Sequence, residues 1–155
     1  MSHNLAQLNI GRLLAPIDAP EIAEFKGALD TINALAEASF GFVWRLKDDE
    51  TNNATGLAWT ADPLLIPNLS VWTSIPSLFE FVYRSAHQPF LRRRREWFEK
   101  ADIVVVLWWI PDSHRPTVAE ALERLEHLRL HGPTAYGFTF RHAFDHDGAA
   151  LQSSP

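Results

Sequence analysis

A single histidine precedes four consecutive arginines in the stretch Tyr83–Trp97, which reads YRSAHQPFLRRRREW. Apolar residues recur there at helical spacing, and His87 and Arg94, seven residues apart, lie along one flank of the apolar stripe. An imidazole, with an unperturbed pKa of about 6.5, can act as a general base, and a guanidinium can pair with a carboxylate through two parallel hydrogen bonds. These two side chains therefore predict a catalytic pair on one helix face.

Three features of this stretch leave other interpretations open. Pro89 lacks a backbone donor and disfavours helical geometry just before it, so a break there would separate Arg94 from the face of His87. His87 can equally be a partly buried imidazole that is hydrogen-bonded to a carbonyl or carboxylate. The run Arg92–Arg95 can be a solvated face with ion pairs to nearby glutamates.

Aromatic residues form the second informative set, since the chain has six tryptophans and ten phenylalanines. Trp108 and Trp109 are neighbours on a predicted strand, so they must point to opposite sheet faces. Arg45 is predicted to lie on the face opposite Trp44, where a buried arginine needs a partner, and it is a candidate anchor for an anionic group. The predicted pocket walls are Trp44, Tyr83, Trp108, Trp109 and Phe138. Such rings also commonly serve a core or an interface, and that alternative stays open.

The composition restricts the class of protein. The 155 residues carry a formal net charge of −5 and a pI of about 5.8, which argues against a general binder of nucleic acid or of anionic membranes. The sequence has no cysteine, which excludes disulfides, thiolate metal sites and a cysteine nucleophile. No signal-peptide pattern occurs at the N-terminus, and no apolar run reaches the roughly 18 residues of a membrane helix. We therefore expect a cytoplasmic protein.

Strands and helices alternate along the chain and must position these residues. Period-two alternation predicts a strand over Leu5–Leu13, and Asp18, Pro20 and Glu21 predict the capped start of an amphipathic helix that ends near Ser39. Two more helices are predicted to begin after Ser74, where the helix carries His87, and after Thr117, which starts a capping box. Further strands are predicted over Phe42–Lys47, Leu69–Thr73, Ile103–Ile110 and Ala135–Arg141.

This order, β-α-β-β-α-β with a helix and a strand appended, is that of the ferredoxin-like split βαβ fold, an α+β architecture with an antiparallel sheet. We expect a single domain over residues 1–144 and a frayed C-terminal tail over residues 145–155. Bulky apolar side chains occupy both faces of the predicted sheet. A second subunit is therefore expected to cover the face that the helices leave open, which predicts a homodimer.

The segment Ser70–Trp97 carries a resemblance to known proteins. The two pieces that carry it are SVWTS, at the end of a predicted strand, and the following FEFVYRSAHQPF. Together they resemble the pattern Trp-x-Ser, helix, Ser-x-x-His, which is found in dimeric α/β-barrel proteins similar to antibiotic-biosynthesis monooxygenases. We term these proteins ABM-like. With GFVWRL and VLWWIP, the chain more closely resembles domain-of-unknown-function family 3291 within that architecture, from about Leu5 to Phe144. Phe40 departs from the related sequences, which tend to have proline there.

The resemblance implies several activities without selecting one. The wider superfamily includes cofactor-free monooxygenases, haem-degrading enzymes, and haem-dependent peroxidases and dehydratases, so the fold alone does not define the reaction. The position of His87 is similar to that of the histidine that ligates haem in the haem-degrading branch. Arg94 would then pair with a haem propionate or a substrate carboxylate.

Two hypotheses follow from these patterns. In the first, a homodimer binds a small aromatic or apolar molecule between sheet and helices and oxidises it or carries out a related haem-type transformation. His87 is then the axial haem ligand or the general base, and Arg45 and Arg94 hold anionic groups. In the second, the homodimer is non-catalytic, and its aromatic face binds a ligand or packs against its partner.

Overall fold

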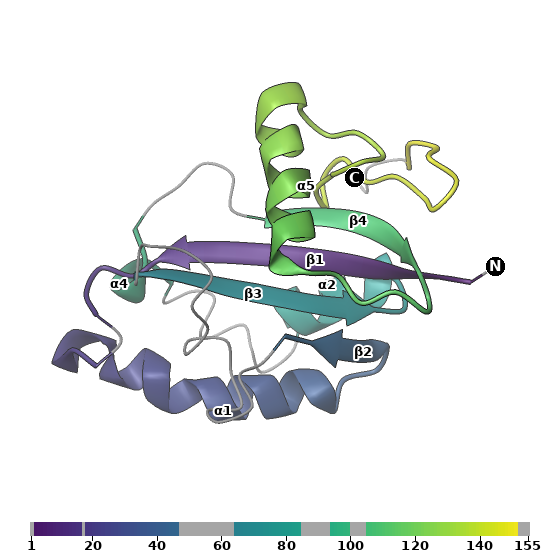
Figure 1. Cartoon of the computed structure of the whole chain (residues 1–155). Coiled ribbons are helices and arrows are strands. Elements are labelled where there is room, and N and C mark those ends of the chain that lie inside the picture. The colour runs from purple at the N-terminus through teal and green to yellow at the C-terminus, as the bar shows by residue number, and fades with distance from the viewer. Residues whose placement is uncertain (1, 17, 47–63, 85–93, 100–104, 152–155) are drawn as a thin grey trace.

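The computed structural model describes residues 2–16, 18–46, 64–84, 94–99 and 105–151 (Figure 1). One antiparallel sheet has the strand order β2-β3-β1-β4. Its strands are β1 (His3–Arg12), β2 (Phe42–Arg45), β3 (Leu65–Trp72) and β4 (Val105–Pro111). The helices are η1 (Pro20–Ile22), α1 (Ala23–Glu37), α2 (Ile75–Arg84), α4 (Arg94–Trp97) and α5 (Val118–His131). This strand order confirms the ferredoxin-like α+β fold. Among the described helices, none has the length and apolar character needed to cross a membrane.

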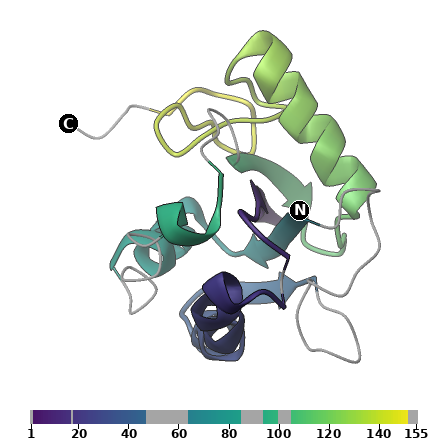
Figure 2. The same ribbon diagram turned by 90° about the vertical axis from the view of Figure 1, so that its left-hand side faces the viewer.

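The register of the central strands decides which side chains share a sheet face. In β1, Gln7 lies opposite Ser70 of β3 and opposite Leu107 of β4. Because successive strand residues point to opposite faces, Leu5, Gln7 and Asn9 share one face while Ala6, Leu8 and Ile10 share the other. Figure 2 shows α5 on one side of the sheet and α2 on the other. We name the two sides the α5 face and the α2 face.

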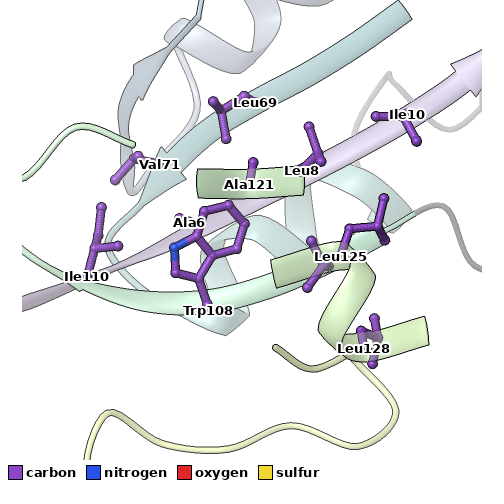
Figure 3. Packing of buried hydrophobic residues seen from close by; sticks show 11 residues of the cluster. Ala6, Leu8, Ile10, Leu69, Val71, Trp108, Ile110, Ala121, Leu125 and Leu128 are labelled. Carbon is purple, nitrogen blue, oxygen red and sulfur yellow. The ribbon is translucent and has the colours of Figure 1, made fainter. Parts of the chain in front are cut away.

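The α5 face is an apolar core. Leu125 and Leu128 of α5 are almost fully buried, and they pack with strand side chains from β1, β3 and β4 (Figure 3). The strand members of this cluster are Ala6, Leu8, Ile10, Leu69, Val71, Val106, Trp108 and Ile110. Each fully buried leucine contributes about 1.5–3 kcal/mol, so these contacts are enough to hold α5 on the sheet. The appended helix therefore covers the face for which a second subunit was expected, and that reason for a homodimer was wrong.

Two separate apolar clusters lie on the α2 face. One surrounds Trp72 and includes Leu5, Leu107 and the α2 residue Leu78. The other lies near the opposite end of β1 and contains Leu13, Ile22 and Trp97, which come from the residue after β1, from η1 and from α4. The β1 and β3 residues between these clusters on this face are the polar ones described below.

Two of the three predicted helix starts, those at Asp18 and Thr117, differ in outcome. Thr117 does cap α5, since its Oγ1 accepts a hydrogen bond of 3.1 Å from the backbone N–H of Glu120. The predicted Asp18 cap was wrong. Ala19 precedes η1 without any side-chain cap, and the Asp18 carboxylate instead accepts a hydrogen bond from the Lys26 ammonium. A 3-10 turn thus begins the segment, with an ion pair in place of the cap.

The strand predicted over Ala135–Arg141 is reduced to two isolated bridges, Thr134–Gly137 and Leu107–Phe138. Phe138 exchanges two backbone hydrogen bonds of 2.8 Å with Leu107, and its ring joins the Trp72 cluster. We expected a frayed tail after Phe144. Residues 145–151 form a turn in which the Asp145 carboxylate accepts from the N–H groups of residues 147 and 149, while residues 152–155 lie outside the described residues.

A tight approach at Gly41 gives a stability prediction. Gly41 has a φ of 85°, and a Cβ there would lie 2.4 Å from Cβ of Ser77. Gly41→Ala should therefore destabilise the fold by more than about 1 kcal/mol. Gly27, inside α1, has no atom within 4 Å of such a Cβ, so Gly27→Ala should stabilise it by about 0.5–1 kcal/mol. Urea unfolding measures both, and equal effects of the two substitutions would contradict the observed turn.

Candidate functional site

A polar cluster lies in the middle of the α2 face. It consists of Gln7 and Asn9 from β1 and of Asn68 and Ser70 from β3, paired across the two strands. Gln7 and Ser70 are only 7% and 6% exposed, whereas Asn9 is half-buried and Asn68 is exposed. The cluster therefore runs from solvent into the centre of the sheet.

Hydrogen bonds fix the buried end of the polar cluster. Nε2 of Gln7 lies 2.7 Å from Oγ of Ser70, 3.0 Å from Oδ1 of Asn68 and 3.1 Å from the main-chain oxygen of Asn68. Nε1 of Trp72 donates to the same Ser70 Oγ at 2.9 Å. Trp72 is itself held between the rings of Phe42 and Phe81, at centroid distances of 5.5 and 5.2 Å. The serine hydroxyl is thus held in place by two neighbours.

Arg45 extends this polar cluster toward the edge of the sheet. It lies opposite Ser70 in the register, and its side chain is only 8% exposed. Its guanidinium donates from Nη2 and Nε to Oε1 of Glu37, at 3.2 and 3.3 Å, and the Glu37 side chain is 42% exposed. The expected buried arginine therefore has a carboxylate partner from the end of α1. It lies beside the polar cluster, as a site residue would.

A β-bulge divides the residues predicted for β2. Phe42 lies opposite Trp72, and a register shift follows before Trp44 pairs with Val71. The strict alternation predicted for this strand was therefore wrong. Trp44 packs half-buried against the α5-face core, while Phe42 and Arg45 belong to the α2 face.

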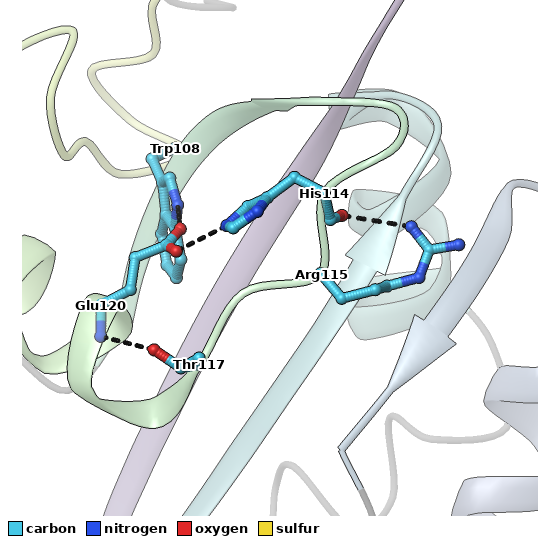
Figure 4. A network of polar contacts seen from close by, with 5 residues as sticks. All are labelled: Trp108, His114, Arg115, Thr117 and Glu120. Carbon is cyan, nitrogen blue, oxygen red and sulfur yellow. Dashed lines mark hydrogen bonds and ion pairs between the residues drawn. The ribbon is translucent and has the colours of Figure 1, made fainter.

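Trp108 also belongs to the α5 face, where it is fully buried. Its indole Nε1 donates to Oε2 of Glu120 at 3.0 Å, and Oε1 of the same carboxylate lies 2.6 Å from Nε2 of His114 (Figure 4). This network fastens the start of α5 to the sheet. The structure therefore places Trp44 and Trp108 in the core, on the opposite face from Arg45.

The remaining predicted ring residues lie on the α2 side. Trp109 is half-buried, and its indole Nε1 donates to the main-chain oxygen of Phe144 at 2.7 Å. Phe138 is fully buried in the Trp72 cluster. Tyr83 is 41% exposed, with its ring 4.7 Å from that of Phe79. Trp108 and Trp109 point to opposite faces, which confirms the prediction from their adjacency.

His87 lies outside the described residues, and for Arg94 the structure describes the backbone, at the start of α4. Their proposed pairing is therefore still a prediction. In the sequence, His87 falls between α2 and α4. Both helices contribute to apolar clusters of the α2 face. Within the described ranges, no three histidine, aspartate or glutamate side chains gather closely enough to hold a metal ion.

Sequence reasoning missed the polar cluster, although a signal for it was present. Gln7 and Asn9 alternate with apolar residues in β1, and Asn68 and Ser70 do so in β3. Each pattern alone is typical of a strand with a solvated face. The strand register places the two polar pairs side by side on a face that helices partly cover. Only this register distinguishes a site from an ordinary surface.

A separate cavity of about 270 Å³ lies near the C-terminal turn. Its lining residues are Pro133, His142, Ala143, Phe144, Ala150 and Leu151. None of them belongs to the polar cluster. This lining has one titratable side chain and lacks the convergent polar groups that orient a ligand.

The sheet order and the polar cluster define a ferredoxin-like α+β protein with a compact hydrogen-bonding site on one sheet face. The chain belongs to the family described as "Domain of unknown function (DUF3291)", whose model matches residues 4–154. This match confirms the resemblance to family 3291 stated from the sequence.

Two solved structures are similar to this chain. PA3566 from Pseudomonas aeruginosa is 16% identical, with a TM-score of 0.48 over 76% of this chain and 98% of that chain. SnoaB, a cofactor-independent oxygenase from Streptomyces nogalater, is also 16% identical, with a TM-score of 0.44 over 77% of this chain and 100% of that chain. Likenesses at this level do not transfer an activity. No curated protein matches the chain.

The Trp108–Glu120 hydrogen bond gives a second stability prediction. Glu120→Ala would leave a fully buried indole N–H without its acceptor, which should cost about 1–3 kcal/mol in the free energy of unfolding. Glu120→Gln keeps an acceptor oxygen and should retain most of that stability. Glu123→Ala, at an exposed position of the same helix, is the control and should change the free energy of unfolding by less than about 0.5 kcal/mol. Equal urea midpoints for Glu120→Ala and Glu123→Ala would show that the hydrogen bond does not anchor α5.

Proposed function

We propose that this protein binds a small aromatic or apolar molecule on the α2 face of its sheet, at the polar cluster, and oxidises it with molecular oxygen as the electron acceptor. The observation that carries the proposal is the buried Gln7–Ser70–Trp72 hydrogen-bond network between two apolar clusters. Binding sites are typically apolar surfaces with a few fixed polar groups that orient the ligand. The cytoplasm is the compartment that we propose, in keeping with a chain that has no cysteine.

The positions of the apolar clusters support an aromatic or apolar ligand. Trp72, Phe42 and Phe81 form one wall beside Ser70, and the cluster of Leu13, Ile22 and Trp97 lies beyond Asn9. Rings of this size provide stacking and large contact areas. The polar cluster between them supplies hydrogen bonds, so the body of the ligand and its polar group have separate contacts.

For the chemistry we propose His87 as the general base. The support is its place in the sequence between α2 and α4, together with the resemblance of Ser70–Trp97 to ABM-like proteins. The described polar groups of the cluster are amides and a hydroxyl, which are not the imidazole, thiolate, thioether or phenolate ligands that hold haem iron. A haem at this site would therefore depend on His87 alone. Arg94 would hold an anionic group of the ligand.

Haemin titration of the purified protein, beside His87→Ala, distinguishes the two roles of this histidine. We expect the same broad absorption from both proteins, because a general base does not ligate iron. A sharp Soret band in the wild type that is lost in His87→Ala would contradict this expectation and make His87 the axial ligand.

Blocking the polar cluster tests the proposed site directly. The neutral fluorescent probe N-phenyl-1-naphthylamine should bind the wild-type protein, and Asn68→Phe, which places a ring at the exposed end of the cluster, should weaken binding at least about tenfold. Glu126→Phe, at an exposed position of α5, is the matched control and should leave binding unchanged. Absence of binding, or equal weakening by both substitutions, would refute the proposed site.

The competing hypothesis is a non-catalytic homodimer. A homodimer is still our prediction, but α5 already buries the α5 face within one chain, so the dimer would use another surface. Sedimentation velocity at micromolar protein concentration distinguishes a dimer from a monomer, and a stable monomer would refute the predicted homodimer. If the wild-type protein binds the probe but shows no reaction that depends on His87, the result would favour a non-catalytic homodimer that binds a ligand.

A further inference from the structure

The hydrogen bonds of Ser70 leave its own proton available. A serine hydroxyl has two acceptor lone pairs and one donor hydrogen. Oγ of Ser70 accepts from Nε2 of Gln7 at 2.7 Å and from Nε1 of Trp72 at 2.9 Å, so both lone pairs are used. No acceptor for its O–H occurs among the described residues. Because Ser70 is 94% buried, this O–H is a donor that an acceptor on a bound ligand would satisfy.

The Gln7 amide has the opposite requirement. One neighbour of its terminal nitrogen is the main-chain oxygen of Asn68, which can only accept, and this contact identifies that end of the amide as the NH2 group. The amide carbonyl, Oε1, must then point away from Ser70 and Asn68. In the part of the chain that the structure describes, no group donates to it. An acceptor thus lies beside a buried donor.

We infer that the polar cluster recognises a ligand group that presents an acceptor and a donor side by side, as a primary amide or a hydroxy-carbonyl group does. The inference rests on the proposed function, whose ligand it specifies. The acceptor of the ligand receives the Ser70 O–H, and its donor is directed to Oε1 of Gln7. Trp72 holds Ser70 in the orientation that leaves this hydrogen free, which makes Trp72 a positioning residue.

This pairing disfavours two other classes of ligand. A carboxylate offers acceptors only, so one of its oxygens would face the lone pairs of Gln7 Oε1. A ketone satisfies Ser70 but leaves the Gln7 carbonyl without a donor. A site built to hydrogen-bond a donor rejects an analogue that lacks it, because the bound analogue takes the acceptor out of water without a partner. Arg45 does not change this expectation, since Glu37 already balances its charge.

Three naphthalene probes of nearly equal shape test the inference by calorimetry on the wild-type protein. They are 2-naphthamide, 2-acetonaphthone, in which a methyl group replaces the NH2, and 2-naphthoate. We expect 2-naphthamide to bind at least about tenfold more tightly than either of the others, because it alone offers both an acceptor and a donor. In Ser70→Ala both 2-naphthamide and 2-acetonaphthone should bind more weakly, because each directs its carbonyl oxygen to the Ser70 O–H, while the near-ultraviolet circular dichroism of the variant reports whether it is still folded. The wild-type comparison does not depend on the variant.

The outcomes separate this inference from the proposed function. Equal affinities for 2-naphthamide and 2-acetonaphthone, both displaced by N-phenyl-1-naphthylamine, would overturn the donor–acceptor pairing and leave the binding site intact. Tighter binding of 2-naphthoate would also overturn it and would make Arg45 the anchor. If neither these probes nor N-phenyl-1-naphthylamine bind at millimolar concentration, the proposed function itself fails.

Discussion

The pairing of β1 with β3 is the constraint on which the rest of this structure depends. With Gln7 opposite Ser70 and Leu8 opposite Leu69, the pleat directs every polar residue of the cluster to the α2 face and the apolar residues to the α5 face. A shift of the register by one residue would exchange the faces and place amides in the α5 core. The site and the core are thus specified by the same pairing.

Burial of polar groups in the middle of a sheet lowers stability unless they are paired. An unmade hydrogen bond costs about 1–3 kcal/mol per group, whereas apolar side chains at the same positions would add to the core. The structure satisfies Nε2 of Gln7 through the neighbouring strand β3 and the Trp72 indole through Ser70 of the same strand, and α5 supplies apolar burial on the opposite face. Local departures from an ideal core are typical of functional positions. We therefore interpret the polar cluster as a functional position, where polar groups replace part of the core.

The fold could be predicted from the sequence because hydrophobic periodicity and turn residues act locally. The order of strands and helices and the Thr117 cap depend on neighbouring residues and are observed. The features that were missed depend on contacts between segments far apart in the sequence. Examples are the burial of one sheet face by α5, the β2 bulge that separates Trp44 from Phe42, and the pairing of Arg45 with Glu37.

The candidate site was predictable only in part. Arg45 was recognised because an arginine within a buried strand is costly, and it does lie beside the polar cluster. Gln7 and Ser70 gave no comparable signal, because polar residues that alternate with apolar ones are typical of any half-exposed strand. Trp44 and Trp108 are predicted from the sequence as pocket walls, whereas the structure places them in the α5-face core. Ring size does not say which face a strand residue occupies.

Two indole N–H groups allow the most direct test of where a ligand binds. Trp72 lies on the α2 face beside Ser70, and Trp108 lies on the α5 face, bonded to Glu120. In a nitrogen–proton correlation spectrum of the wild-type protein titrated with 2-naphthamide, the Trp72 indole and the Gln7 side-chain amide should shift while the Trp108 indole stays in place. Shifts confined to Trp108, or to residues remote from both, would contradict the account.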